Sequence, residues 1–156
     1  MGWFAGALEG CFSSAGLAAG AEVIGVIPQQ LMEREQGHRH LTELHIVRSM
    51  HERKALMSEL ADGFIALPGG YGTFEEFCEI LTWAQLGLHQ KPCGLLNAAN
   101  YYEHLIGLFD HALAEGLLKA RFRSLVIEAD KPAELLERME KYHGEKFEKL
   151  ISESEV

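Results

Sequence analysis

Short apolar runs alternate with segments of helical period along most of this chain. The apolar runs cover residues 23–27, 44–47, 64–67, 93–96 and 125–127. None of them alternates strictly between apolar and polar residues, which is typical of strands covered on both faces. Segments with helical spacing lie at residues 49–61, 73–86, 101–115 and from 132 to 142 or beyond. This order predicts an α/β fold with a parallel sheet, and we expect one domain across residues 1–156.

Charge and hydropathy exclude several classes of partner. The net charge of -9 leaves no basic excess to neutralise a nucleic-acid backbone. No apolar run approaches the roughly 20 residues of a membrane span. The start of the chain lacks the basic flank and long apolar core of a signal peptide. The cysteines Cys11, Cys78 and Cys93 are odd in number and widely spaced. We therefore expect reduced thiols in a cytoplasmic protein, not a disulfide frame or a metal site.

A glycine-rich stretch, PGGYGT at residues 68–73, follows the apolar run 64–67 and opens a predicted helix. In an open parallel sheet, ligands bind beyond the carboxyl ends of the strands. Glycine lets a ligand approach the backbone closely, and the free N–H groups of a helix start favour an anion. The stretch therefore predicts a phosphate site. The alternative is a plain tight turn with Thr73 as the N-cap, in which Glu76 completes a capping box.

The two glutamates of the following helix differ in the faces they occupy. On a helical wheel, Glu76 lies near the apolar arc, whereas Glu75 points the other way with Glu79. A carboxylate beside a buried stripe, at the mouth of a glycine loop, is a candidate site residue. Glu76 is therefore the stronger candidate of the two.

A second candidate group lies on the preceding helix, where Arg53 falls at the centre of the apolar stripe and Lys54 just outside it. A guanidinium among core residues needs an anionic partner, because a buried unpaired charge costs several kcal/mol. Arg53 either forms a structural salt bridge or reaches solvent, or it binds a phosphate or faces Glu76 across a cleft. Ser49 and Glu52 fit a capping box at the start of this helix.

Two other features carry weaker hypotheses. His38 and His40 form an H-x-H pair without matching ligands elsewhere, which is poor evidence for a metal. Trp83 fits the core better than a stacking platform for a ligand.

Two motifs together resemble the LONELY GUY family of cytokinin riboside 5′-monophosphate phosphoribohydrolases, whose members are often labelled lysine decarboxylases. The motifs are MHERK at residues 50–54 and PGGYGTFEE at residues 68–76. They match the family's Arg-Lys pair and its P-G-G-x-G-T-x-x-E signature in full. The resemblance extends over roughly residues 17–136. It implies a Rossmann-like α/β domain with a parallel sheet flanked by helices.

The resemblance further implies hydrolysis of the N-glycosidic bond of a cytokinin riboside 5′-monophosphate or AMP, giving free base and ribose 5-phosphate. Arg53 and Glu76 would form the catalytic pair. The substrate-binding residues would be Glu35, Lys54, Gly70, Tyr71, Gly72, Thr73, Glu75 and Thr82. The chemistry is consistent, because a carboxylate stabilises the positive charge that develops on the sugar and can activate water. An arginine can stabilise negative charge on the phosphate or the departing base.

The same resemblance implies a homodimer acting on a small-molecule nucleotide, and the chemistry needs no metal or organic cofactor. Family members usually open with a strand, a Cys-Gly-Ser-Ser type loop, a helix and a second strand, and we expect this chain to lack that segment. Residues 1–10 then match a glycine-rich family loop, with Trp3, Phe4 and Ala7 where glycines are expected. Without the first strand, we expect a central sheet edge to lie open.

Two alternative functions remain. The first is a non-catalytic module that binds a nucleotide or another phosphorylated ligand. The second is an amino-acid decarboxylase, which would need a lysine that holds pyridoxal phosphate. Neither Lys54 nor Lys91 lies in a sequence context that marks such a site.

Overall fold

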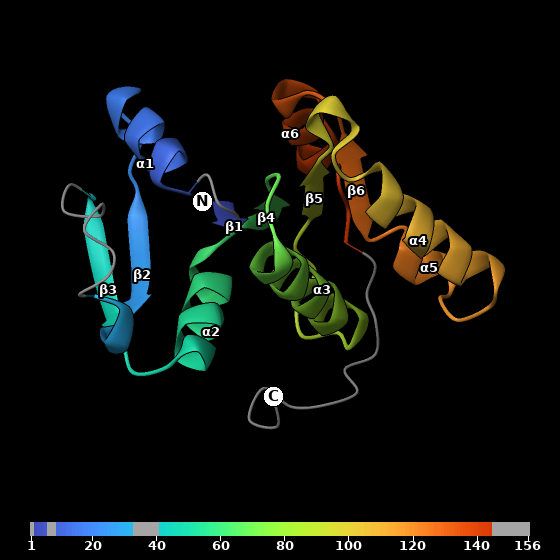
Figure 1. The fold of residues 1–156 in the computed structure, drawn as a ribbon, viewed down its shortest axis with the longest axis horizontal. Helices are drawn as coiled ribbons and strands as arrows, with labels where there is room; N and C mark the ends of the chain where they lie inside the picture. The colour runs from blue at the N-terminus through green and yellow to red at the C-terminus, as the bar shows by residue number, and fades with distance from the viewer. Residues whose placement is uncertain (1, 6–8, 33–40, 145–156) are drawn as a thin grey trace.

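The computed structural model describes residues 2–5, 9–32 and 41–144, in which strands and helices alternate (Figure 1). The elements are β1 (Gly2–Ala5), α1 (Glu9–Ala18), β2 (Ile24–Pro28), η1 (Gln29–Leu31), β3 (Glu43–Val47), α2 (Met50–Leu60), β4 (Gly63–Ala66), α3 (Tyr71–Gln85), β5 (Cys93–Leu96), η2 (Ala98–Asn100), α4 (Glu103–Ala114), α5 (Ala120–Arg123), β6 (Val126–Ala129) and α6 (Pro132–Glu140). Within this part of the chain, no helix has the length and hydropathy of a membrane span.

The strands form two parallel sheets. Four strands pair in the order β1-β4-β5-β6, and β2 pairs with β3 in a separate two-stranded sheet. Each of the five predicted apolar runs overlaps one of these strands, and β5 coincides with its run. The predicted Rossmann-like α/β fold, a parallel sheet flanked by helices, is confirmed.

The start of the chain differs from the prediction. Residues 2–5 are not a loop: they form β1, whose register with β4 runs from Gly2 opposite Gly63 to Ala5 opposite Ala66. β4 is paired on both sides, with β1 and with β5. Among the described residues, however, β1 pairs only with β4 and β2 only with β3, so the expectation of an open sheet edge is not overturned and stays a prediction. An unpaired strand edge presents backbone N–H and C=O groups that need partners, and a short apolar segment satisfies them by pairing.

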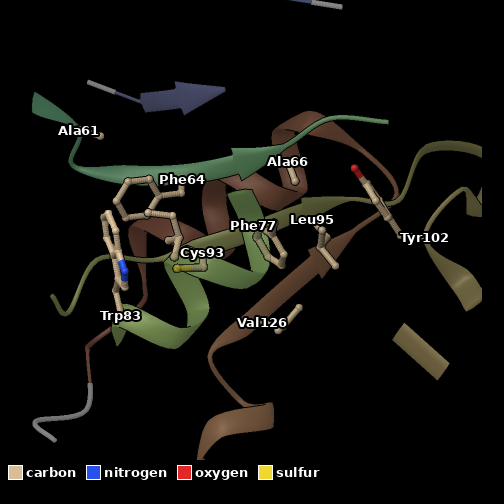
Figure 2. Packing of buried hydrophobic residues seen from close by; sticks show 10 residues of the cluster. Ala61, Phe64, Ala66, Phe77, Trp83, Cys93, Leu95, Tyr102 and Val126 are labelled. Carbon is tan, nitrogen blue, oxygen red and sulfur yellow. The ribbon is translucent and has the colours of Figure 1, made fainter. Parts of the chain in front are cut away.

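The main core lies between the four-stranded sheet and α3 (Figure 2). Every residue of β4 is buried, as expected for a strand covered on both faces. From α3, Phe77, Ile80 and Trp83 pack onto this face of the sheet. The expectation that Trp83 belongs to the core is confirmed. On the other face, Leu135 and Met139 of α6 pack against Ile65, so the end of β4 is held firmly from both sides.

Candidate active site

The loop after β4 leads directly into α3, which begins at Tyr71 with Gly70 as its N-cap. The first helical bond joins the N–H of Phe74 to the carbonyl of Gly70 at 3.2 Å. The predicted N-cap at Thr73 is therefore wrong, and so is the capping box that gave Glu76 a structural role. Glycine is tolerated at an N-cap, so the helix begins three residues earlier than the Thr-x-x-Glu pattern indicates.

The start of α3 is open to approach from outside. Among the described residues, a Cβ built on Gly70 or on Gly72 would meet no atom within 4 Å, and Tyr71 is 92% exposed. Thr73 differs from its neighbours because it is buried. The first N–H groups of a helix of 15 residues, with the positive end of its dipole, suit an anion.

A capped helix start places Arg53 and Lys54 on the first turns of α2. The hydroxyl of Ser49 accepts a hydrogen bond from the N–H of Glu52 at 3.1 Å, as the predicted capping box requires. The carboxylate of Glu52 accepts from the N–H of Arg48 at 2.8 Å, one residue before the N-cap. This cap fixes where α2 begins, and with it the face on which Arg53 lies.

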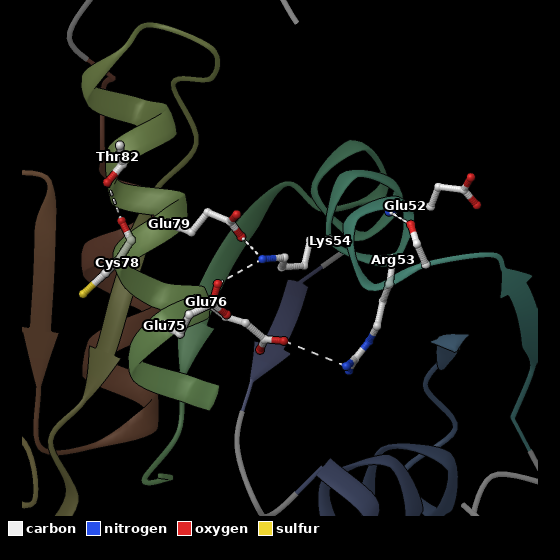
Figure 3. A network of polar contacts seen from close by, with 9 residues as sticks. Glu52, Arg53, Lys54, Glu75, Glu76, Cys78, Glu79 and Thr82 are labelled. Carbon is white, nitrogen blue, oxygen red and sulfur yellow. Dashed lines mark hydrogen bonds and ion pairs between the residues drawn. The ribbon is translucent and has the colours of Figure 1, made fainter. Parts of the chain in front are cut away.

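Arg53 and Glu76 point toward one another from α2 and α3 (Figure 3). The distance from Nη1 of Arg53 to Oε1 of Glu76 is 3.9 Å, and the two side chains are 15% and 11% exposed. For this atom pair the distance exceeds hydrogen-bond length. Burial limits screening by solvent, so each group experiences the charge of the other strongly. The structure thus brings the two predicted catalytic residues together.

Lys54 joins the same two helices on a neighbouring face. Its ammonium lies 2.8 Å from Oε2 of Glu79 and 3.0 Å from Oε1 of Glu75 (Figure 3). Burial opposes the charged form of Lys54, but the hydrogen bonds to Glu79 and Glu75 outweigh burial and raise its pKa. Lys54 is therefore a charged link between α2 and α3, and it helps to hold Arg53 opposite Glu76.

Thr82, another predicted substrate-binding residue, does not lie at this pair. Thr82 is exposed and donates a hydrogen bond to the carbonyl of Cys78 at 2.8 Å. It lies six residues beyond Glu76 along α3, or about 9 Å by the helical rise. Glu35, His38 and His40 lie outside the described residues. Within the described ranges, no three His, Cys, Asp or Glu side chains cluster as a metal site would require.

The family model for possible lysine decarboxylases matches residues 10–139. The chain belongs to this family. A probable cytokinin riboside 5′-monophosphate phosphoribohydrolase of Oryza sativa subsp. japonica is 50% identical over 135 residues, which cover 86% of this chain and 60% of the relative. The cytokinin riboside 5′-monophosphate phosphoribohydrolase of Rhodococcoides fascians is 54% identical over 121 residues, or 77% of this chain and 61% of the relative.

A third relative from Arabidopsis thaliana, with the same enzyme name, is 47% identical over 135 residues, or 86% of this chain and 63% of the relative. These matches confirm the LONELY GUY resemblance. The chain spans about three-fifths of the length of these curated relatives. The family model and the three matches all include the helices that carry the Arg-Lys pair and Glu76 in this LONELY GUY family member.

Two contacts of the glycine loop were missed by reasoning from sequence. The hydroxyl of Tyr101 donates to the carbonyl of Gly69 at 2.6 Å, and the hydroxyl of Tyr102 donates to the carbonyl of Leu67. The order of the elements along the chain could have predicted these contacts. Both tyrosines follow β5 closely, and the ends of parallel neighbours such as β4 and β5 meet at one sheet edge.

Proposed function

We propose that this chain hydrolyses the N-glycosidic bond of a nucleoside 5′-monophosphate and releases free base and ribose 5-phosphate. One observation carries the proposal. Arg53 and Glu76 face one another at 3.9 Å near the start of a helix whose glycine turn is open. The names of the relatives support a cytokinin riboside 5′-monophosphate as substrate, and AMP is the unmodified alternative.

The glycine turn is the proposed phosphate site. The backbone at Gly70, Tyr71, Gly72 and Thr73 presents N–H groups at the positive end of α3, and the absence of side chains at the glycines allows close approach. Binding the phosphate here positions the ribose relative to the residues of the first turns. Positioning of this kind makes a large contribution to the rate, because the reacting groups are already aligned.

Glu76 is the proposed catalytic carboxylate. Cleavage of the bond between C1′ and the base nitrogen builds positive charge on the sugar, which a carboxylate stabilises. Water then attacks C1′, its proton passes to Glu76, and the electron pair of the broken bond leaves with the base, which takes up a proton. Arg53 supplies the complementary charge, because its guanidinium can stabilise the phosphate or the departing base. This chemistry needs no metal and no organic cofactor.

The remaining predicted residues have supporting roles in this proposal. Lys54 and Glu75 form an ion pair, which supports a role in fixing α2 against α3 at the site's border. The substrate contacts predicted for Glu35, Lys54, Glu75 and Thr82 stay predictions.

We also keep the proposals of a homodimer and of a cytoplasmic location. The apolar side chains of Leu44, Ile46 and Met50 are 41%, 55% and 43% exposed on β3 and the start of α2, and such surfaces often mark protein contacts. Light scattering tests the homodimer. The thiols of Cys78 and Cys93 are free, which supports a reducing compartment.

The direct test of the reaction is incubation of the purified chain with AMP and, separately, with isopentenyladenosine 5′-monophosphate. We expect chromatography to detect free base and an equal amount of ribose 5-phosphate from at least one of the two. Binding of both nucleotides without release of base would instead favour the non-catalytic binding module. Turnover of an amino acid with added pyridoxal phosphate, and an absorbance band of its Schiff base, would favour the decarboxylase.

A further inference from the structure

The turn after β5 reaches across the sheet edge to the glycine loop after β4. Phe64, Ile65 and Ala66 pair in parallel with Cys93, Gly94 and Leu95, so the chain leaves both strands at the same edge. There the hydroxyl of Tyr101 donates to the carbonyl of Gly69 at 2.6 Å. Figure 2 shows the hydroxyl of Tyr102 directed toward the chain that leaves β4, where it donates to the carbonyl of Leu67.

The two residues before these tyrosines have an unfavourable backbone conformation, which sets the direction of the tyrosine side chains. Ala99 and Asn100 both have positive φ, at 52° and 60°. A residue with a Cβ adopts this left-handed conformation at a steric cost, which is larger for alanine than for asparagine. The side-chain oxygen of Asn97 accepts from the N–H of Tyr102 at 2.6 Å and closes the turn. Strain of this kind persists only where the surrounding contacts hold it, and the hydroxyl bonds of Tyr101 and Tyr102 are such contacts.

The two hydroxyl bonds have different consequences for the loop. In a planar trans peptide the C=O and the N–H point in opposite directions. The bond from Tyr101 therefore fixes the direction of the Gly70 N–H, which belongs to the same peptide as the Gly69 carbonyl. The bond from Tyr102 cannot orient an N–H in this way, because the next residue is Pro68, which has none.

The exposure of the two tyrosines separates them further. Tyr102 is 1% exposed, and burial together with the neighbouring Tyr101 raises its pKa to about 12. Its hydroxyl satisfies a buried carbonyl and anchors the end of β4. Tyr101 is 49% exposed, so among the described residues its hydroxyl has no buried group to satisfy other than the carbonyl of Gly69. Removing this hydroxyl therefore acts mainly through the loss of that bond. A peptide between two glycines can otherwise rotate at little steric cost.

We propose that Tyr101 is a positioning residue that holds the Gly69–Gly70 peptide in the orientation required for phosphate binding. The inference rests on the proposed function and extends it to a residue outside the glycine loop. With the Gly69 carbonyl bound by the hydroxyl, the Gly70 N–H remains available to the anion and the carbonyl dipole is kept from it. Without the hydroxyl, the peptide samples both orientations and the loop binds phosphate less tightly.

The test compares Tyr101→Phe with wild type and with Tyr142→Phe, a matched control that removes a hydroxyl beyond α6. Isothermal titration calorimetry with ribose 5-phosphate measures the affinity of the phosphate site without turnover. We expect the Kd of Tyr101→Phe to rise about five- to tenfold, the loss typical of one hydrogen bond at a binding site. We expect the KM for the nucleotide to rise by the same factor with kcat within about twofold. Affinity for free adenine should be unchanged, and loss of one hydrogen bond should lower the Tm by no more than about 4 °C. The Kd of Tyr142→Phe for ribose 5-phosphate should match wild type.

Three other results would overturn the role of Tyr101 or the proposed function. Equal Kd values for Tyr101→Phe and wild type would overturn the inference and leave the proposed function intact. A parallel loss of adenine affinity and Tm would also overturn it, because it would show general structural damage. If wild type neither binds ribose 5-phosphate nor releases base, the proposed function fails and the inference fails with it.

Discussion

At the scale of single residues, Arg53 and Glu76 bring opposite charges to within 3.9 Å, with little of either side chain exposed. Removing one partner takes a nearby opposite charge away from the other, and this affects both stability and chemistry. The two effects can be separated by experiment, because stability is measured without substrate. Substitution of either residue should therefore change activity.

Arg53→Gln should lower kcat/KM about 100-fold, because a charged hydrogen-bond donor to the phosphate or the departing base is lost. It should also lower the free energy of unfolding by about 1–3 kcal/mol, since Glu76 loses a partially buried partner. Steady-state release of base and denaturant unfolding measure the two quantities. Arg138→Gln is the control, because Arg138 pairs with Glu134 at the exposed surface of α6. An unchanged kcat/KM in Arg53→Gln would remove the arginine from the mechanism.

Both residues could be predicted from helical spacing. Arg53 falls on an apolar stripe and Glu76 beside one, and burial of charge implies a partner. Spacing could not reveal the contact of Tyr101 with Gly69, which joins residues 32 positions apart. That contact depends on which strands are neighbours in the sheet. Glu35, predicted to contact substrate, lies outside the described residues and stays a prediction.

At the scale of elements, the connection from α3 to β5 contains a half-buried histidine. Nε2 of His89 lies 2.9 Å from the carbonyl of Ile80, and Nδ1 accepts from the N–H of Lys91 at 3.1 Å. The Lys91 N–H can only donate, so the proton of the neutral ring is assigned to Nε2. Burial, together with the charge of Lys91, lowers the pKa of His89, although the bond to Ile80 opposes the shift. The neutral ring therefore stabilises this connection.

A stability change at mildly acidic pH follows. The folded state binds the His89 proton less tightly than the unfolded state, whose pKa is about 6.5. The stabilisation is thus present above that pH and is lost as pH falls through the lower pKa of the folded state. Denaturant unfolding from pH 8 to pH 5 should show a steeper loss for wild type than for His89→Gln. Parallel curves for the two proteins would contradict the assignment.

Element boundaries could be predicted less well than element types. The start of α3 was expected at Thr73 because Thr-x-x-Glu is a common start signal, but Gly70 serves as the N-cap. The short helix α5, from Ala120 to Arg123, has too few residues to show a period. Strand β5 was predicted correctly because apolar residues fill it completely and turn residues flank it.

At the scale of the whole molecule, the parallel α/β fold followed from the alternation of strands and helices, but the pairing of strands did not. Two features depend on long-range contacts: the separation of β2 and β3 into their own sheet, and the pairing of β1 with β4. Apolar runs identify strands without identifying their neighbours. The single domain expected across residues 1–156 stays a prediction.

The pairing of β1 can be tested with proline. Trp3 and Phe4 lie opposite Phe64 and Ile65, and backbone N–H groups alternate in direction along a strand. Of Trp3→Pro and Phe4→Pro, the variant that removes an N–H directed at β4 should lower the free energy of unfolding by about 2–3 kcal/mol. The other proline variant should lower the free energy of unfolding by clearly less. Thermal unfolding measures both, and two variants as stable as wild type would show that β1 does not contribute to the sheet.

The proposed reaction depends on the charge of one carboxylate. Glu76→Gln keeps the shape of the side chain and removes the charge, so folding should be preserved while the sugar cation loses its stabilising group. Glu137→Gln is the matched control, because Glu137 pairs with Lys141 on the exposed surface of α6.

The most direct measurement is the rate at which purified Glu76→Gln releases free base from isopentenyladenosine 5′-monophosphate or AMP, compared with wild type and Glu137→Gln. The account predicts turnover by wild type and by the control, and a loss of at least about 100-fold in Glu76→Gln, measured at a temperature at which this variant is folded. Release of base by Glu76→Gln at the wild-type rate would contradict it.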